Sequence, residues 1–158
     1  MRRIAHAVLF SLVAASTPGF GHGGAAAPGE HSGHGAAIGM PGEPAKVART
    51  VAVTMNDLMR FVPASITVKH GETIRFLVRN QGRIKHEMVL GTVAELKAHA
   101  EQMRKFPGMV HADPNQVSVD PGQTGELVWR FPKAGKIGFA CLQPGHFEAG
   151  MKGSVTVR

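Results

Sequence analysis

The chain has 158 residues, which suit one compact domain with extensions and exclude two domains of ordinary size. Its single cysteine excludes an internal disulfide, so the thiol is buried, free, paired between chains or bound to a metal. The formal net charge of +7 is not concentrated in any run of lysine and arginine, and tyrosine is absent. We therefore expect no nucleic-acid partner.

Residues 1–21 have the features of a secretory signal peptide. Two arginines follow Met1, and the segment from Ile4 to Ala15 is mostly apolar but short for a membrane span. Small residues at 13–15 and 19–21 offer two cleavage sites, and the second would leave His22 at the mature N-terminus. We expect an exported, periplasmic protein with no membrane segment after cleavage; the alternative is an uncleaved anchor.

Residues 22–45 form a leader that is rich in glycine, alanine and histidine. With so few large apolar groups it cannot offset the entropy lost on ordering, so we predict a flexible segment. Its histidines, His22, His31 and His34, could bind copper once the chain folds around the ion. The alternative is a linker in which these histidines are incidental.

Residues 46–158 form the predicted folded domain, which consists mainly of short strand-forming runs separated by glycine and proline. Strands are predicted within 47–55, 60–80 with breaks at Pro63 and Gly71, 85–91, 115–131 with a turn at 120–122, 136–141 and 151–157. Short strands at regular spacing predict an all-β, antiparallel sandwich or barrel.

One segment, 92–108, has helical character and interrupts the strands. Thr92 and Glu95 form the pattern of a capping box, and Pro107-Gly108 ends the segment. The apolar residues of this segment recur at the spacing of one helix face: Val93, Leu96, Ala100 and Met103. His99 and Met103 share a helix face, and Met109 and His111 follow, so these four could gather additional copper. The alternative is that the methionines pack the helix onto the sandwich.

The C-terminal region holds the residues with the clearest chemistry. Cys141 ends a predicted strand, Pro144-Gly145 turns the chain, and His146 and Met151 follow at intervals of five residues. His86, which lies in the strand-like stretch 85–91, is the natural fourth member. Two imidazoles and a thiolate in a plane, with a weak axial thioether, are the ligands of a type 1 copper site.

These residues also admit other interpretations. Taken alone, Cys141 is a buried small hydrophobe, His146 a loop residue and Met151 part of the core. Zinc also binds cysteine and histidine, but two histidines, one cysteine and one methionine suit it poorly. A thiol nucleophile with His146 as its base would lack the usual strand–helix setting, so we expect no enzymatic activity.

The stretch FACLQPGHFEAGMKGSVTV, from Phe139 to Val157, resembles the copper loop of the cupredoxins, and HEMVLG resembles their first histidine strand. The spacing C-x4-H-x4-M is similar to that of rusticyanin-type proteins. The resemblance covers 47–158, and the whole chain resembles most the CopI-type cupredoxins associated with periplasmic copper tolerance. It implies a Greek-key cupredoxin β-sandwich with one inserted α-helix, and the copper ligands His86, Cys141, His146 and Met151. Glu87 departs from the asparagine or serine found there in many cupredoxins.

Two functions fit this resemblance. The first is a redox-active periplasmic protein that handles copper and contributes to copper tolerance, which the leader and the helical insert favour. The second is a one-electron carrier between periplasmic redox partners, with His146 as the electron port. Both require copper ions, and the second also requires a redox protein partner whose identity the sequence leaves open.

Overall fold

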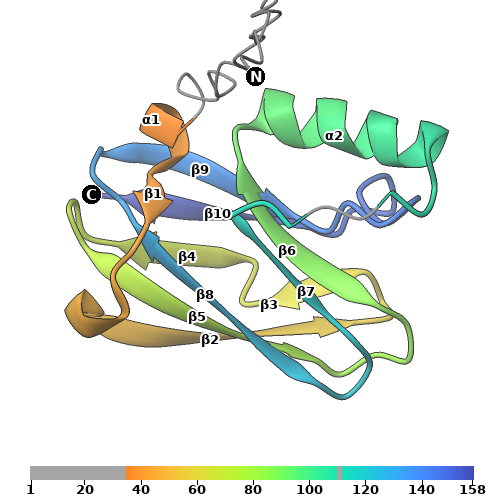
Figure 1. The fold of residues 1–158 in the computed structure, drawn as a ribbon, viewed down its shortest axis with the longest axis horizontal. Helices are drawn as coiled ribbons and strands as arrows, with labels where there is room; N and C mark the ends of the chain where they lie inside the picture. Colours follow the sequence, from red (N-terminus) through yellow and green to blue (C-terminus); the bar gives the residue numbers. More distant parts are fainter. Residues whose placement is uncertain (1–34, 110–111) are drawn as a thin grey trace, which may run out of the picture.

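The computed structural model describes residues 35–109 and 112–158, and it consists of two five-stranded sheets packed face to face (Figure 1). In the first sheet the strand order is β1-β8-β5-β2-β3. These strands are β1 (Met40–Pro41), β8 (Thr124–Arg130), β5 (Thr73–Asn80), β2 (Arg49–Asn56) and β3 (Arg60–Val62). In the second sheet the order is β4-β10-β9-β6-β7. These are β4 (Ser65–Val68), β10 (Lys152–Val157), β9 (Gly135–Ala140), β6 (His86–Gly91) and β7 (Gln116–Val119).

The core lies between the sheets and follows from the alternation of each strand. In β5, Ile74, Phe76 and Val78 are fully buried, while Leu77 between them is 42% exposed. Successive side chains of a strand point to opposite faces, so one face of β5 meets the second sheet and the other meets solvent. The all-β sandwich predicted from the sequence is confirmed.

The sequence predicts an antiparallel sandwich, but two pairs of strands are parallel. β2 runs parallel to β5 over seven residues, from Arg49↔Ile74 to Met55↔Asn80, and β4 runs parallel to β10. The chain changes sheet between β3 and β4 and again between β4 and β5, so strands that are neighbours in sequence are separated in space. The apolar periodicity is two in either orientation and cannot reveal this.

The predicted helical insert forms α2 (Val93–Lys105), which lies against β6 and β9 of the second sheet (Figure 1). The capping box is present: the Thr92 hydroxyl accepts the Glu95 N–H, and the Glu95 carboxylate accepts the Thr92 N–H. Leu96, Ala100 and Met103 are buried as predicted, but Val93 is 76% exposed. The apolar face therefore begins at Leu96.

The segment just before the predicted domain boundary differs from the flexible leader expected there. It contains α1 (Gly35–Ile38), β1 and a 3-10 turn (Pro44–Lys46), and β1 pairs with β8. Ile38 is buried, and its carbonyl accepts a hydrogen bond of 2.7 Å from Trp129 Nε1. Residues 38–42 thus belong to the folded unit. The sequence did not predict this, because the segment contains few apolar residues.

The signal peptide and the first part of the leader, with His22, His31 and His34, lie outside the described residues, as does His111. Among residues 35–109 and 112–158, no helix is both long and apolar enough to cross a bilayer.

Candidate metal centre

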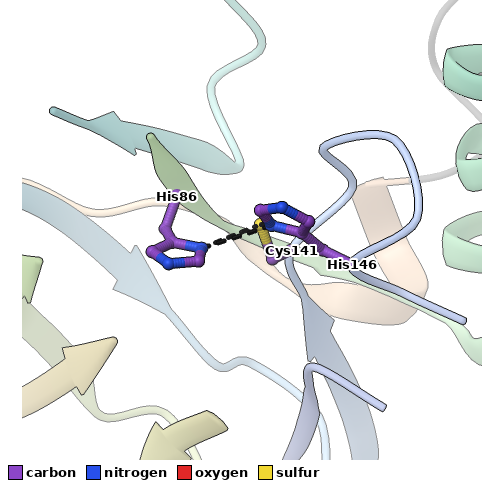
Figure 2. A group of neighbouring side chains, drawn as sticks. All are labelled: His86, Cys141 and His146. Carbon is purple, nitrogen blue, oxygen red and sulfur yellow. Dashed lines mark hydrogen bonds between the residues drawn. The ribbon is translucent and has the colours of Figure 1, made fainter. Parts of the chain in front are cut away.

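Three of the four predicted ligands come together at one end of the sandwich (Figure 2). His86 is the first residue of β6, Cys141 directly follows β9, and His146 lies in the loop that joins β9 to β10. The side chains of all three converge from these separate segments. Within the described residues, they form the one group of three or more His, Cys, Asp and Glu side chains close enough to share a metal ion.

The loop from Cys141 to Met151 is closed by its own backbone. The Cys141 N–H donates to the Met151 carbonyl at 3.1 Å, and the Met151 N–H donates to the His146 carbonyl at 3.0 Å. Gly145 has a φ of 86°, a conformation that glycine adopts without the penalty other residues incur. These bonds hold Met151 beside Cys141 and His146, and Met151 is fully buried in the same core cluster as Cys141.

The distances between the ligand atoms fit a trigonal metal site. His86 Nδ1 lies 3.2 Å from His146 Nδ1, and Cys141 Sγ lies 3.2 Å from His146 Nδ1 and 3.9 Å from His86 Nδ1. Metal bonds of roughly 2.0–2.3 Å to nitrogen and sulfur separate three in-plane ligands by roughly 3–4 Å. The donor set of two imidazoles and one thiolate suits copper.

Cys141 is buried and its sulfur accepts a hydrogen bond of 3.4 Å from the Glu87 N–H. Burial raises the pKa of the Cys141 thiol from its ordinary 9.0 to about 12, against the opposing effect of the Glu87 and Gln143 N–H groups. Without metal the thiol therefore keeps its proton at neutral pH, and metal binding releases that proton.

The two histidines differ in exposure. His86 is fully buried, whereas His146 is only partly buried and so forms the solvent-facing side of the site. Burial lowers the pKa of His146 below its ordinary 6.5, and the neighbouring His86 lowers it further, because two positive charges this close would repel each other. His146 is therefore a neutral imidazole at pH 7, which is the form that binds metal.

Asp57 contacts His86, and the sequence did not indicate it as part of the site. It lies in the turn after β2, and its Oδ1 is 3.1 Å from His86 Nε2. The Arg83 N–H lowers the pKa of Asp57 below its ordinary 3.8 against partial desolvation, and the contact with His86 lowers it further. Nothing in the sequence signals this contact, since 29 residues separate Asp57 from His86 and aspartate is ordinary in turns.

Glu87, the departure from the family pattern, is buried between β6, β7 and the copper loop. Its Oε1 accepts the Leu142 N–H at 3.1 Å, and its Oε2 accepts the Ser118 hydroxyl and the Gln143 amide, each at 3.2 Å. The Glu87 carboxylate thus connects β6 to Leu142 and Gln143, the two residues that follow Cys141.

The secondary copper residues of the insert are only partly brought together. Met103 is buried on the inner face of α2, while His99 is partly buried and Met109 is exposed. His99, Met103 and Met109 line one cavity of about 210 Å³, which also touches Gln143 and Pro144 of the copper loop.

Comparison with known families and proteins agrees with this geometry. The family described as copper binding proteins, plastocyanin/azurin family, matches residues 47–158. The chain therefore belongs to this family of copper-binding proteins, and the predicted resemblance to cupredoxins is confirmed.

Two relatives of this chain are copper-resistant cuproproteins. The chain is 57% identical over 154 residues to the copper-resistant cuproprotein CopI of Rubrivivax gelatinosus, covering 96% of this chain and 92% of that protein. It is 37% identical to CopI of Pseudomonas aeruginosa, covering 79% of this chain and 84% of that protein.

Solved structures show the same fold. Auracyanin B superposes with a TM-score of 0.61 at 26% identity, covering 76% of this chain and 94% of that one. The reduced auracyanin of Roseiflexus castenholzii superposes with a TM-score of 0.60 at 22% identity, covering 71% and 98%. The cupredoxin β-sandwich expected from the sequence is thereby confirmed.

Proposed function

We propose that this chain is a periplasmic type 1 copper protein that contributes to copper tolerance, in which His86, Cys141, His146 and Met151 would hold the copper ion. The observation that carries the proposal is the convergence of His86, Cys141 and His146 within bonding distance of one ion. The copper-resistance proteins among its relatives support the biological role.

Copper bound there supplies one-electron chemistry between its cuprous and cupric states. The protein's contribution is a rigid and mostly dry setting. Cys141 and Met151 are buried in the core, the Glu87 N–H and carboxylate hold the cysteine loop, and Asp57 contacts His86. A site whose ligands are fixed by the fold moves little when the metal changes oxidation state, which favours fast electron transfer.

The second candidate function, electron transfer between protein partners, is favoured by the exposure of His146. Beside it lie Pro144 and Gly145, which are exposed, and Phe147, which is partly buried. Lys152 Nζ lies 4.4 Å from the centre of the Phe147 ring. A small apolar surface around a partly exposed ligand would allow a redox partner to approach the metal closely. Neither candidate function requires catalysis, so we propose a binding protein and not an enzyme.

The first test is an absorption and EPR titration of the purified mature protein with Cu(II), beside Cys141→Ser. We expect a strong visible thiolate-to-copper band in the wild type and none in the variant, because only the thiolate gives that transition. Further equivalents bound without the band would place additional copper on the leader or on the insert containing His99, Met103 and Met109. A colourless wild type that is indistinguishable from Cys141→Ser would exclude the type 1 site.

Growth on copper separates the two functions. In a bacterial strain that lacks this gene, the wild type should restore copper tolerance and Cys141→Ser should not. Unchanged copper tolerance after deletion of the gene would contradict the proposed role and favour the electron carrier.

A further inference from the structure

Asp57 links the turn after β2 to the first histidine strand. Its Oδ2 accepts the Arg83 N–H at 2.7 Å, and its Oδ1 lies 3.1 Å from Nε2 of His86. The Asp57 side chain is 39% exposed, whereas the His86 side chain is fully buried. The carboxylate therefore covers the outer edge of the buried imidazole.

The contact with Asp57 selects which nitrogen of His86 faces the metal site. Nδ1 points to the cluster, 3.2 Å from His146 Nδ1 and 3.9 Å from Cys141 Sγ, while Nε2 points to Asp57. A carboxylate accepts hydrogen bonds, so Nε2 must carry the proton and Nδ1 must present its lone pair. Without such a partner a neutral imidazole distributes its proton between the two nitrogens.

The conformation of residues 80–84 allows the Asp57 carboxylate to reach His86. A Cβ at position 82 would overlap Oδ1 of Asp57, so only glycine lets the carboxylate reach His86. Asn80, which is fully buried, fixes the same segment: its Oδ1 accepts the Gly82 N–H at 2.8 Å and its Nδ2 donates to the Ile84 carbonyl at 2.7 Å. Asp57 and Asn80 together hold the residues that lead into His86.

We propose that Asp57 is a positioning residue of the metal centre, which orients His86 with Nδ1 toward the ion and stabilises the cupric state over the cuprous state. The proposal rests on the ligand role of His86 proposed above. A carboxylate on the outer nitrogen of a ligand imidazole makes the inner nitrogen a stronger donor. The cupric ion carries one more positive charge, so it gains more from this donor and from the nearby negative charge.

Asp57→Asn tests the effect of the charge, because asparagine keeps the shape and one acceptor oxygen. Asp120→Asn is the matched control: Asp120 lies at the same end of the sandwich and pairs with Lys85, the neighbour of His86, without contacting a ligand. The measurement is a redox titration of the copper-loaded full-length mature protein. Partners of metal-bound histidines change metal affinity by roughly 10-fold or more.

We expect Asp57→Asn to raise the ratio of cuprous to cupric affinity by about 10-fold, which for one electron is a rise of 59 mV in the reduction potential. Asp120→Asn should move the potential much less. Equal shifts in the two variants would mean a general charge effect and would overturn the proposal, as would an unchanged potential in Asp57→Asn.

Imidazole nitrogen NMR tests the positioning without relying on the colour of the site. In the copper-free and Cu(I)-loaded wild type, His86 should hold its proton on Nε2, and copper-free Asp57→Ala should show a mixture of tautomers. An unaltered single tautomer in Asp57→Ala would refute the orienting role. If the wild type gives no thiolate–copper band, the proposed function fails, while the tautomer of His86 still decides the role of Asp57. Thermal unfolding of each copper-free variant identifies any that fails to fold.

Discussion

At the scale of single residues, Glu87 shows how a buried carboxylate on one strand can support the loop that carries the cysteine. The residue contributes its N–H to Cys141 Sγ and its two carboxylate oxygens to donors from Ser118, Leu142 and Gln143. Buried charges are costly unless hydrogen bonds satisfy them, and here three donors do so. The same bonds join β6 and β7 to the loop that carries the cysteine.

Replacing Glu87 with alanine should destabilise the copper-free protein by about 1–3 kcal/mol, because the buried Leu142 N–H would lose its acceptor. Ser118 is exposed and Gln143 is partly exposed, so both side chains can form hydrogen bonds with water instead. Their loss of Glu87 therefore contributes less to the destabilisation. Glu87→Gln keeps an oxygen for Leu142 and should cost clearly less. Urea unfolding measures both values. Equal losses in the two variants would mean that the negative charge, and not the acceptor for Leu142, is what matters.

How much of the site could be predicted depends on the kind of residue. His86, Cys141 and His146 were proposed from their chemistry and spacing, and the fold places them together. The importance of position 87 was foreseen from the family pattern, but its three partners were not. Asp57 was missed, because it meets the site through a tertiary contact between the turn after β2 and the first residue of β6, and aspartate is common in turns.

At the scale of elements, α2 is attached to the sandwich by a side chain that fits a gap between two strands. Gly91 of β6 and Gly138 of β9 are paired in register, and a Cβ on either would press on the Leu96 side chain. The two glycines thus make room for Leu96 at the strand pair. The cluster around Leu96 includes Ala140 and Leu142, the two neighbours of Cys141. The helix therefore buries the outer face of the strand that leads to the cysteine.

Leu96→Ala should lower the free energy of unfolding by about 2–5 kcal/mol, as expected for a large-to-small change in a close-packed cluster. Val93→Ala is the matched control on the same helix, since Val93 is 76% exposed and should change stability by no more than about 0.5 kcal/mol. Chemical denaturation of the copper-free proteins provides both numbers. Similar losses from the two substitutions would contradict the packing described for Leu96.

The secondary structure was the most predictable part of the fold. The capping residues Thr92 and Glu95 marked the start of α2, and glycine and proline marked the breaks between strands. The parallel pairing of β2 with β5 was not predictable in the same way. Strand partners are set by how the sheets stack, whereas the local pattern records only which face is buried.

At the scale of the whole molecule, the folded unit begins before the family match at residue 47. Residues 38–42 cross one edge of the first sheet, where β1 extends the sheet beside β8 and Gly42 N–H donates to the Val128 carbonyl at 3.0 Å. Trp129, the only tryptophan, donates its indole N–H to the Ile38 carbonyl, and both side chains are buried. An indole nitrogen can only donate, so removal of this segment would leave it without its carbonyl acceptor.

Two truncations test this boundary. A chain that begins at residue 47 loses the burial of Ile38, worth about 1.5–3 kcal/mol, and the acceptor for Trp129, worth about 1–3 kcal/mol. We therefore expect it to be less stable than a chain that begins at residue 35 by roughly 2.5–6 kcal/mol, with the difference visible in thermal unfolding followed by tryptophan fluorescence. The chain that begins at residue 35 keeps every contact described for Ile38 and serves as the control. Both truncations retain His86, Cys141, His146 and Met151, so both should still develop the thiolate–copper band. Equal stability of the two chains would show that the segment adds nothing to the folded unit and that the domain begins at residue 46, as the sequence alone suggested.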